Sequence, residues 1–144
     1  MKTEKVNKGA ILSTLWIFAT LNYLYCDLMG FMDAGMLKQY LTGTVNGMEI
    51  NREFLLGAAI LIEIPISLVL LSRVLNHRAC RWANIIAGLV MTVVQSATLI
   101  IGTPTSYYLF FSIIEIATTI FIFWYALNWK PVIKLPGGEN LDPN

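Results

Sequence analysis

The stretch that decides the fold lies near the C-terminus, where residues 106–128 are SYYLFFSIIEIATTIFIFWYALN. Its one charged residue is Glu115, close to the middle. A helix needs about 20 mostly apolar residues to cross the hydrocarbon core of a bilayer, so this stretch predicts a transmembrane helix. Strands are excluded because a membrane barrel needs alternating segments of about ten residues, and the sequence has no such alternation.

Three further stretches have the same character, at residues 10–31, 54–75 and 83–101. A backbone in lipid has to satisfy its own hydrogen bonds, which again favours helices. The first stretch is too long, and too polar at Asn22 and Asp27, for a cleaved signal peptide. We therefore expect one domain over residues 1–144, an all-α antiparallel four-helix bundle integral to the membrane. Its connections include a long outer loop at 32–53, and a disordered tail follows at 131–144.

The composition excludes several classes of function. Charged residues make up 13% of the chain, against about 25% in soluble domains. The net charge is only +1 and the basic residues are scattered, so no nucleic-acid surface is expected. Cys26 and Cys80 form no CxxC pair, and His77 has no ligand set beside it in sequence. We therefore expect neither a metal site nor a cofactor.

The distribution of basic residues predicts the orientation in the membrane. The chain has 10 Lys and Arg residues, and only Lys38 and Arg52 fall outside if the N-terminus lies in the cytoplasm. We therefore expect both termini in the cytoplasm and the protein in the cytoplasmic (plasma) membrane. The residues on the cytoplasmic side are then Lys2, Lys5, Lys8, Arg73, Arg78, Arg81, Lys130 and Lys134.

The outer loop carries local signals of order. Asp33 can cap a short helix that continues to Leu41, and Asn46-Gly47 favours a tight hairpin turn. Two interpretations stay open, an ordered cap over the bundle and an ordinary surface loop. On the inner side, residues 76–82 are expected to form a tight basic turn. Tyr107 and Tyr108 are expected to lie near the outer boundary as aromatic anchors.

Two helices contain the same local pattern around an acid, Ile62-Glu63-Ile64 and Ile114-Glu115-Ile116. Both helices run in the same direction, and the glutamates lie at similar depth. This similarity favours two related helical hairpins, although short apolar helices also match by chance.

Glu63 and Glu115 are the strongest candidates for a functional site. An acid near the bilayer centre costs about 2.5–3.5 kcal/mol on insertion scales, so it should face the bundle interior and have a partner. No basic residue lies at their depth, and we expect at least one of them to carry a proton. Pro65 frees the carbonyl of Leu61, which fits either a kinked cavity wall or a tolerated transmembrane proline.

Other polar residues at helical spacing extend this candidate site. On the last helix, Tyr108, Ser112 and Glu115 share one face. Asp27 fits either the mouth of a cavity or a solvated helix end. The candidate ligand-binding residues are Glu63, Glu115, Asp27, Asn22, Gln95, Tyr108 and Ser112.

Several stretches together resemble a known family. They are 12–18 with Asp27, Glu63-Ile64-Pro65-Ile66, 70–75, Arg81-Trp82-Ala83-Asn84-Ile85-Ile86-Ala87-Gly88 and the helix of Glu115. The chain resembles a prokaryotic family of four-helix membrane proteins known only as a domain of unknown function. That resemblance implies a membrane location and the fold, and it implies no activity.

Two looser similarities concern other membrane proteins. Sterol-isomerase-like proteins of the emopamil-binding type line a lipid pocket with an Asp on the first helix and a Glu before a Pro on the second. Asp27 and Glu63-Ile64-Pro65 would take those parts. DoxX-like membrane proteins share the helix count. These are analogies at the level of the fold, which does not transfer function.

Three function classes follow. The first is a pocket that binds a lipid or small apolar ligand between the helices, with carboxylates fixing its polar group. The second is a non-catalytic helper or interaction subunit, whose polar side chains join helices or dock a membrane partner or a second copy. The third is an isomerase-like enzyme with Glu63 and Glu115 as acid and base.

Overall fold

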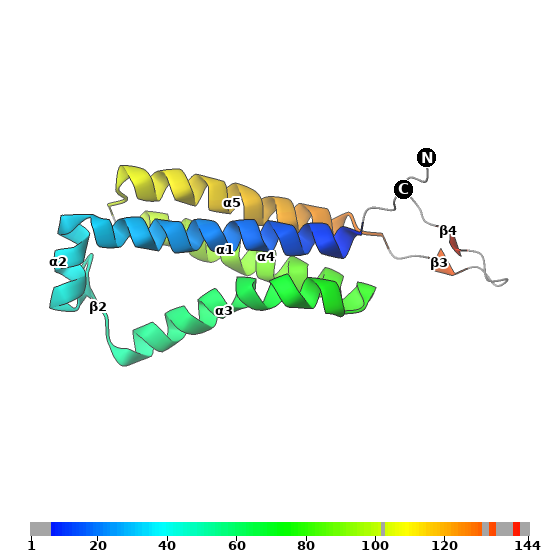
Figure 1. Cartoon of the computed structure of the whole chain (residues 1–144), viewed down its shortest axis with the longest axis horizontal. Helices are drawn as coiled ribbons and strands as arrows, with labels where there is room; N and C mark the ends of the chain where they lie inside the picture. The colour runs from blue at the N-terminus through cyan, green and yellow to red at the C-terminus, as the bar shows by residue number, and fades with distance from the viewer. Residues whose placement is uncertain (1–6, 102, 131–132, 135–139, 142–144) are drawn as a thin grey trace.

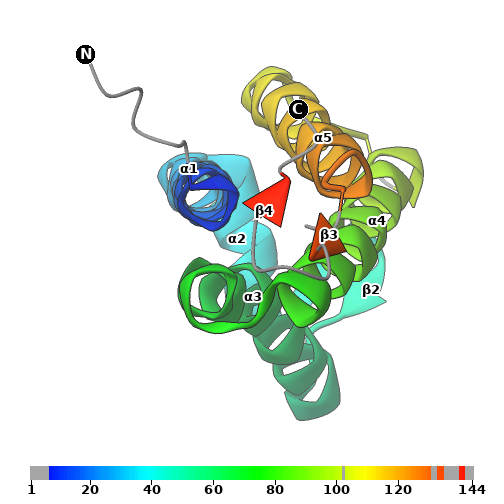
Figure 2. The ribbon, with the colours of Figure 1, turned by 90° about the vertical axis from the view of Figure 1, so that its right-hand side faces the viewer.

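A computed structural model gives the architecture and describes residues 7–101, 103–130, 133–134 and 140–141. Its long helices are α1 (Lys8–Met32), α3 (Arg52–Val74), α4 (His77–Ile101) and α5 (Ser106–Leu127). Between α1 and α3 lie the short helix α2 (Ala34–Thr42) and a hairpin of β1 (Thr44–Val45) and β2 (Met48–Glu49). Viewed along the bundle, the long helices surround a common centre in the order α1, α5, α4, α3 (Figure 2). The predicted all-α four-helix bundle is confirmed.

All four long helices are long and apolar enough to cross a membrane. Many large apolar side chains stay exposed on their outward faces, such as Phe110 and Ile86 at 61% and 58%. In water such a surface would be costly, whereas lipid tails solvate it without penalty. Length and surface together make this a multi-pass membrane protein.

The two ends of the bundle differ (Figure 1). We call the end that carries α2, the β1–β2 hairpin and the α4–α5 connection the cap end. The opposite end, which carries the described cations Lys8, Arg73, Arg78, Arg81 and Lys130, we call the basic end. Lys2 and Lys5 lie outside the described residues. So does most of the predicted tail, of which Ile133–Lys134 (β3) and Asn140–Leu141 (β4) are described and pair antiparallel.

A buried hydrogen-bond network joins three helices near the basic end. Asn84 on α4 is fully buried, and its Oδ1 accepts from Trp16 Nε1 on α1 at 2.7 Å. Its Nδ2 lies 3.1 Å from Ser72 Oγ on α3 and 2.8 Å from the carbonyl oxygen of Cys80. Apolar side chains surround this network and form the core. They are Leu12, Trp16, Ala19, Leu68, Cys80, Ala87, Met91 and Ile122.

Close backbone approaches hold the helix pairs together. A Cβ on Gly88 would lie 3.2 Å from Thr119 O and from Phe123 on α5. A Cβ on Gly9 would collide with the carbonyl of Ser72 on α3. These glycines allow α4 to pack on α5 and α1 on α3, because only a residue without a side chain lets two backbones come this near.

The predicted tight turn at 76–82 is wrong, since α4 begins at His77. Asn76 caps the helix, with its Oδ1 accepting from Ala79 N at 3.0 Å. The first turn of α4 is polar and basic, so hydropathy alone missed it. Arg81 in that turn donates to the carbonyls of Ala126 and Leu127 at 3.2 and 3.0 Å, where it stabilises the C-terminal end of α5.

The first half of α3 departs from the bundle toward the cap end (Figure 1). Its buried residues are Pro65, Leu68 and Ser72, and none lies before Pro65. A proline inside a helix removes one backbone hydrogen bond and bends the helix. The bend at Pro65 therefore leaves residues 52–64 with little packing against the other helices.

Candidate functional site

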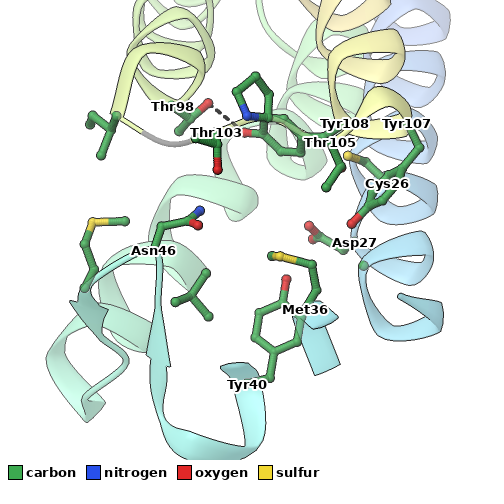
Figure 3. A pocket seen from close by; sticks show the side chains of 15 residues that line it. Cys26, Asp27, Met36, Tyr40, Asn46, Thr98, Thr103, Thr105, Tyr107 and Tyr108 are labelled. Atoms are coloured by element: carbon green, nitrogen blue, oxygen red, sulfur yellow. Dashed lines mark hydrogen bonds between the residues drawn. The ribbon is translucent and has the colours of Figure 1, made fainter. Parts of the chain in front are cut away.

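A cavity of about 200 Å³ lies at the cap end. Its walls come from every element that meets there, so its shape depends on the cap as well as on the spanning helices (Figure 3). The lining residues are Cys26, Asp27, Gly30, Met36, Tyr40, Val45, Asn46, Met48, Thr98, Ile101, Thr103, Pro104, Thr105, Tyr107 and Tyr108.

Local sequence signals build the cap as predicted. The Asp33 carboxylate accepts from the backbone N–H groups of Gly35 and Met36 at 2.8 and 3.1 Å, and so begins α2. Asn46 and Gly47 have φ of 49° and 81°, the left-handed conformations that a tight hairpin turn requires. Gln39 Oε1 accepts from Asn46 N at 2.9 Å and ties the hairpin to α2. The ordered cap is therefore the interpretation that holds.

Asp27 on α1 points into this cavity, together with two tyrosines from other elements (Figure 3). Gly30, one turn further along α1, leaves room for them: a Cβ there would lie 3.2 Å from the hydroxyl of Tyr40 and 3.8 Å from that of Tyr107. Phe31 packs on the Tyr40 ring, with centroids 5.3 Å apart, and holds α2 against α1. The cavity therefore gathers a carboxylate and two phenols at one point.

The polar groups of the wall differ in their hydrogen bonds and charge. Tyr108 Oη donates to Thr98 Oγ1 at 2.8 Å, so its lone pairs remain for another donor. Burial, and less strongly the charge of Asp27, raises the pKa of Tyr40 above its ordinary value of 10.0. That phenol stays neutral in the physiological range. No Lys, Arg or His is among the lining residues, so the charge of Asp27 is not balanced from within the cavity.

A second polar group lies deeper, where α4 meets α5. Gln95 Nε2 donates to Ser112 Oγ at 2.9 Å, and the hydroxyls of Thr92 and Thr119 are 2.8 Å apart. Glu115 stands between these pairs along α5 and is 1% exposed. Among the described residues, neither of its carboxyl oxygens has a hydrogen-bond partner.

Glu115 lies near α1 residues, one of which, Asp27, lines the cap cavity. It lies within electrostatic range of Asp27 and of Tyr23, whose buried hydroxyl also lacks a partner among the described residues. Glu115 itself does not line the cavity. The polar groups thus continue from the cap cavity toward the middle of the bundle. Of the deeper groups, the Glu115 carboxyl and the Tyr23 hydroxyl lack partners among the described residues, which is unusual for buried polar groups.

The structure separates the predicted site residues into four sets. Asp27 and Tyr108 line the cap cavity, while Gln95, Ser112 and Glu115 lie below it. Asn22 turns back to its own helix and donates to Phe18 O at 2.8 Å. Glu63 is exposed on α3, so Glu63 and Glu115 do not meet in one site.

Sequence reasoning missed Tyr40, Tyr107 and Gly30. Tyr107 was expected to act as an interfacial anchor, but it lines the cavity with Tyr108. The available signal was the cap itself: the Asp33 helix start and the Asn46-Gly47 turn predict chain folded over the bundle, so residues at the facing helix ends were candidates. Within the described residues, no group of three or more His, Cys, Asp or Glu side chains could hold a metal ion.

Comparison with known proteins gives one match. The family model described as Family of unknown function (DUF6326) matches residues 2–133. No curated protein matches the chain, and no solved structure does.

Proposed function

We propose that this chain, which belongs to the DUF6326 family of unknown function, binds a small and mainly apolar molecule in the cap cavity. The observation that carries the proposal is the cavity itself, walled on one side by α2 and the hairpin and lined by a carboxylate with no balancing cation. Pockets of this kind, mostly apolar with a few convergent polar groups, are the usual form of small-molecule sites.

The size of the cavity limits the ligand. A dry apolar cavity of about 150 Å³ accommodates benzene, so about 200 Å³ suits a molecule with one ring or a short branched chain. A complete lipid is too large for a cavity of this volume. A lipid-like molecule would therefore place only its polar end there.

The carboxylate of Asp27 defines the polar end of the ligand. No Lys, Arg or His lines the cavity beside it. An ammonium group is therefore favoured over a neutral donor. A charge-assisted hydrogen bond contributes about 1.5–3 kcal/mol, which corresponds to about tenfold or more in affinity.

The orientation of the site follows from the cations. The described cations gather at the basic end, and only Lys38 and Arg52 lie near the cap. By the positive-inside rule this distribution favours both termini in the cytoplasm and the cap cavity at the outer face of the plasma membrane. Labelling an Asn46→Cys variant with a membrane-impermeant maleimide in intact cells tests this, and labelling only after lysis would reverse the orientation.

Two probes of the same shape test the binding site. Benzylamine and benzyl alcohol are titrated separately into the detergent-purified protein, and binding is followed by calorimetry. We expect the amine to bind about tenfold more tightly, and Asp27→Asn to remove that preference. Glu63→Gln is the matched control, because it neutralises an acid outside the cavity and should keep the preference.

Two results would contradict the proposal. One is no saturable binding of either probe to the wild type. The other is an amine preference that survives in Asp27→Asn, which would locate the site elsewhere. Native mass spectrometry of the same preparations adds an independent measurement, since a bound native ligand should be retained by the wild type and lost from Asp27→Asn.

A further inference from the structure

Glu63 occupies an unexpected face of α3. It is exposed, whereas Pro65, two residues further on, is buried against the bundle. Two residues correspond to about 200° around an α-helix, so the Glu63 side chain points away from the core. Its hydrogen-bond partner among the described residues is Ser67 of the same helix, whose Oγ donates to Glu63 Oε1 at 3.1 Å.

The exposed face of α3 has a regular pattern. Its residues follow each other at steps of four, three, four, three and four, the spacing of a helix–helix seam. The apolar members Leu56, Ile60, Leu70 and Val74 are 63%, 61%, 64% and 71% exposed. This α3 stripe comprises Leu56, Ile60, Glu63, Ser67, Leu70 and Val74.

Exposed apolar residues alone are ordinary on a membrane helix, because lipid covers them. The polar pair in the α3 stripe is different. Glu63 lies eleven residues from the start of α3 at Arg52, which is about 16 Å along the helix. At that depth lipid tails offer no hydrogen bond, and acids within membrane spans almost always face protein or a water-filled cavity. Within this chain Glu63 lines an open hollow. Its walls among the described residues all come from α3 itself, so no other helix covers the carboxyl there. The lining residues are Ala59, Ile60, Glu63, Ile64, Ser67, Leu68 and Leu71.

We propose that the α3 stripe binds the α3 stripe of a second copy, with Glu63 and Ser67 at the centre of the contact. Two copies inserted in the same direction are related by a two-fold axis along the membrane normal. That axis brings each stripe residue opposite its own equivalent.

The polar pair is self-complementary in this arrangement. The Ser67 hydroxyl of either copy can donate to a carboxyl oxygen of the opposite copy. The two carboxyls can share a proton, which avoids the repulsion of two like charges. Interhelical polar contacts of this kind promote association in lipid. The occupant is thus argued from polar complementarity and not from apolar exposure.

Cysteine cross-linking in membrane vesicles tests the geometry. Ile60→Cys and Leu70→Cys lie on the α3 stripe, while Ile62→Cys lies about 100° away at nearly the same depth and is also exposed (42%). The native Cys26 and Cys80 are buried, which keeps the background low. We expect a disulfide-linked product of twice the mass from the two stripe variants, several-fold more than from Ile62→Cys.

Dilution in lipid tests the role of Glu63. Förster transfer between labelled copies is measured as the ratio of lipid to protein rises. We expect Glu63→Leu to weaken dimerisation about tenfold, whereas Glu63→Gln, which keeps hydrogen bonding, should stay within about threefold. Ser67→Ala is a second variant for the same measurement, in case Glu63→Leu does not insert into the membrane. It should also weaken the dimer.

Each opposite result overturns the proposal. Equal cross-linking from Ile60→Cys and Ile62→Cys, or none from either, would exclude a contact through the α3 stripe. A product of another mass would show a different protein on this face. An unchanged dimer in both Glu63→Leu and Ser67→Ala would remove the polar pair from the contact. These outcomes are independent of ligand binding in the cap cavity.

Discussion

Replacing Asn84 by alanine should lower the free energy of unfolding by about 2–4 kcal/mol. Its side chain is fully buried and bonds across helices to Trp16 at 2.7 Å and to Ser72 at 3.1 Å. Each interhelical hydrogen bond in a membrane protein contributes about 0.6 kcal/mol on average. The substitution also leaves the N–H of Trp16 buried without an acceptor, which costs about 1–3 kcal/mol. The sum of these terms gives the expected range.

Asn22→Ala is the matched control for this substitution. Asn22 and Asn84 each donate to the carbonyl four residues earlier at 2.8 Å, from spanning helices. Only Asn84 also bonds to other helices, so the difference between the variants isolates the interhelical part. We expect Asn22→Ala to change stability by less than about 0.5 kcal/mol. Reversible unfolding by sodium dodecyl sulfate in mixed micelles measures both.

A double-mutant cycle with Trp16→Phe makes the test specific. Residues that share a hydrogen bond show coupling energies of about 0.5–3 kcal/mol. A coupling below that range, or equal losses from Asn84→Ala and Asn22→Ala, would refute the view that this network holds α1, α3 and α4 together.

Three further predictions follow from single residues. Glu115→Met should stabilise the fold by about 1–3 kcal/mol in the same unfolding assay, because it removes two buried oxygens that lack partners; a loss of stability would reveal a partner for the carboxyl. Gly88→Val should destabilise by about 1–3 kcal/mol, since even a Cβ there would lie 3.2 Å from the Thr119 carbonyl, whereas Gly57→Ala should be neutral or better because it meets open space. In an ultraviolet titration, the Tyr40 phenol should ionise above its ordinary 10.0, because its folded pKa is raised. Its contribution to stability should therefore be intact below pH 10.0 and lost as the pH rises through the folded pKa. Tyr40→Phe identifies this transition, and a titration curve that the variant leaves unchanged would contradict the assignment.

The sequence predicts the spans well because lipid imposes a simple rule. A transmembrane helix must carry enough apolar residues to cross the bilayer core, and the stretch at 106–128 meets this requirement. Local chemistry predicts the cap for a similar reason: Asp33 and Asn46-Gly47 act on their own backbone and need no distant partner. The predicted start of a helix is wrong where its first turn is polar, as in α4 after Asn76.

The sequence could not tell Glu63 from Glu115. Both stand in the pattern Ile-Glu-Ile on helices apolar enough to cross a membrane, yet Glu115 is 1% exposed and Glu63 faces outward. Which face a helix buries is decided by its neighbours in space. On α3 the buried face carries Pro65, Leu68 and Ser72, and Glu63 lies outside it. The local sequence pattern therefore identifies candidate acidic residues but does not assign them to a site.

Polar groups at the two ends of the bundle differ in the hydrogen-bond partners that they find. At the basic end, both Asn84 and Arg81 find partners on other helices, so these groups stabilise the fold. Toward the cap end, Asp27 faces a cavity, and Glu115 lies buried without a partner. An apolar residue in place of a buried polar group without a partner is expected to stabilise the fold, because it removes the cost of the missing hydrogen bond. Glu115 does not line the cavity, whereas Asp27 faces it with no cation among the lining residues. The cap end, and Asp27 in particular, is therefore where ligand binding should be sought.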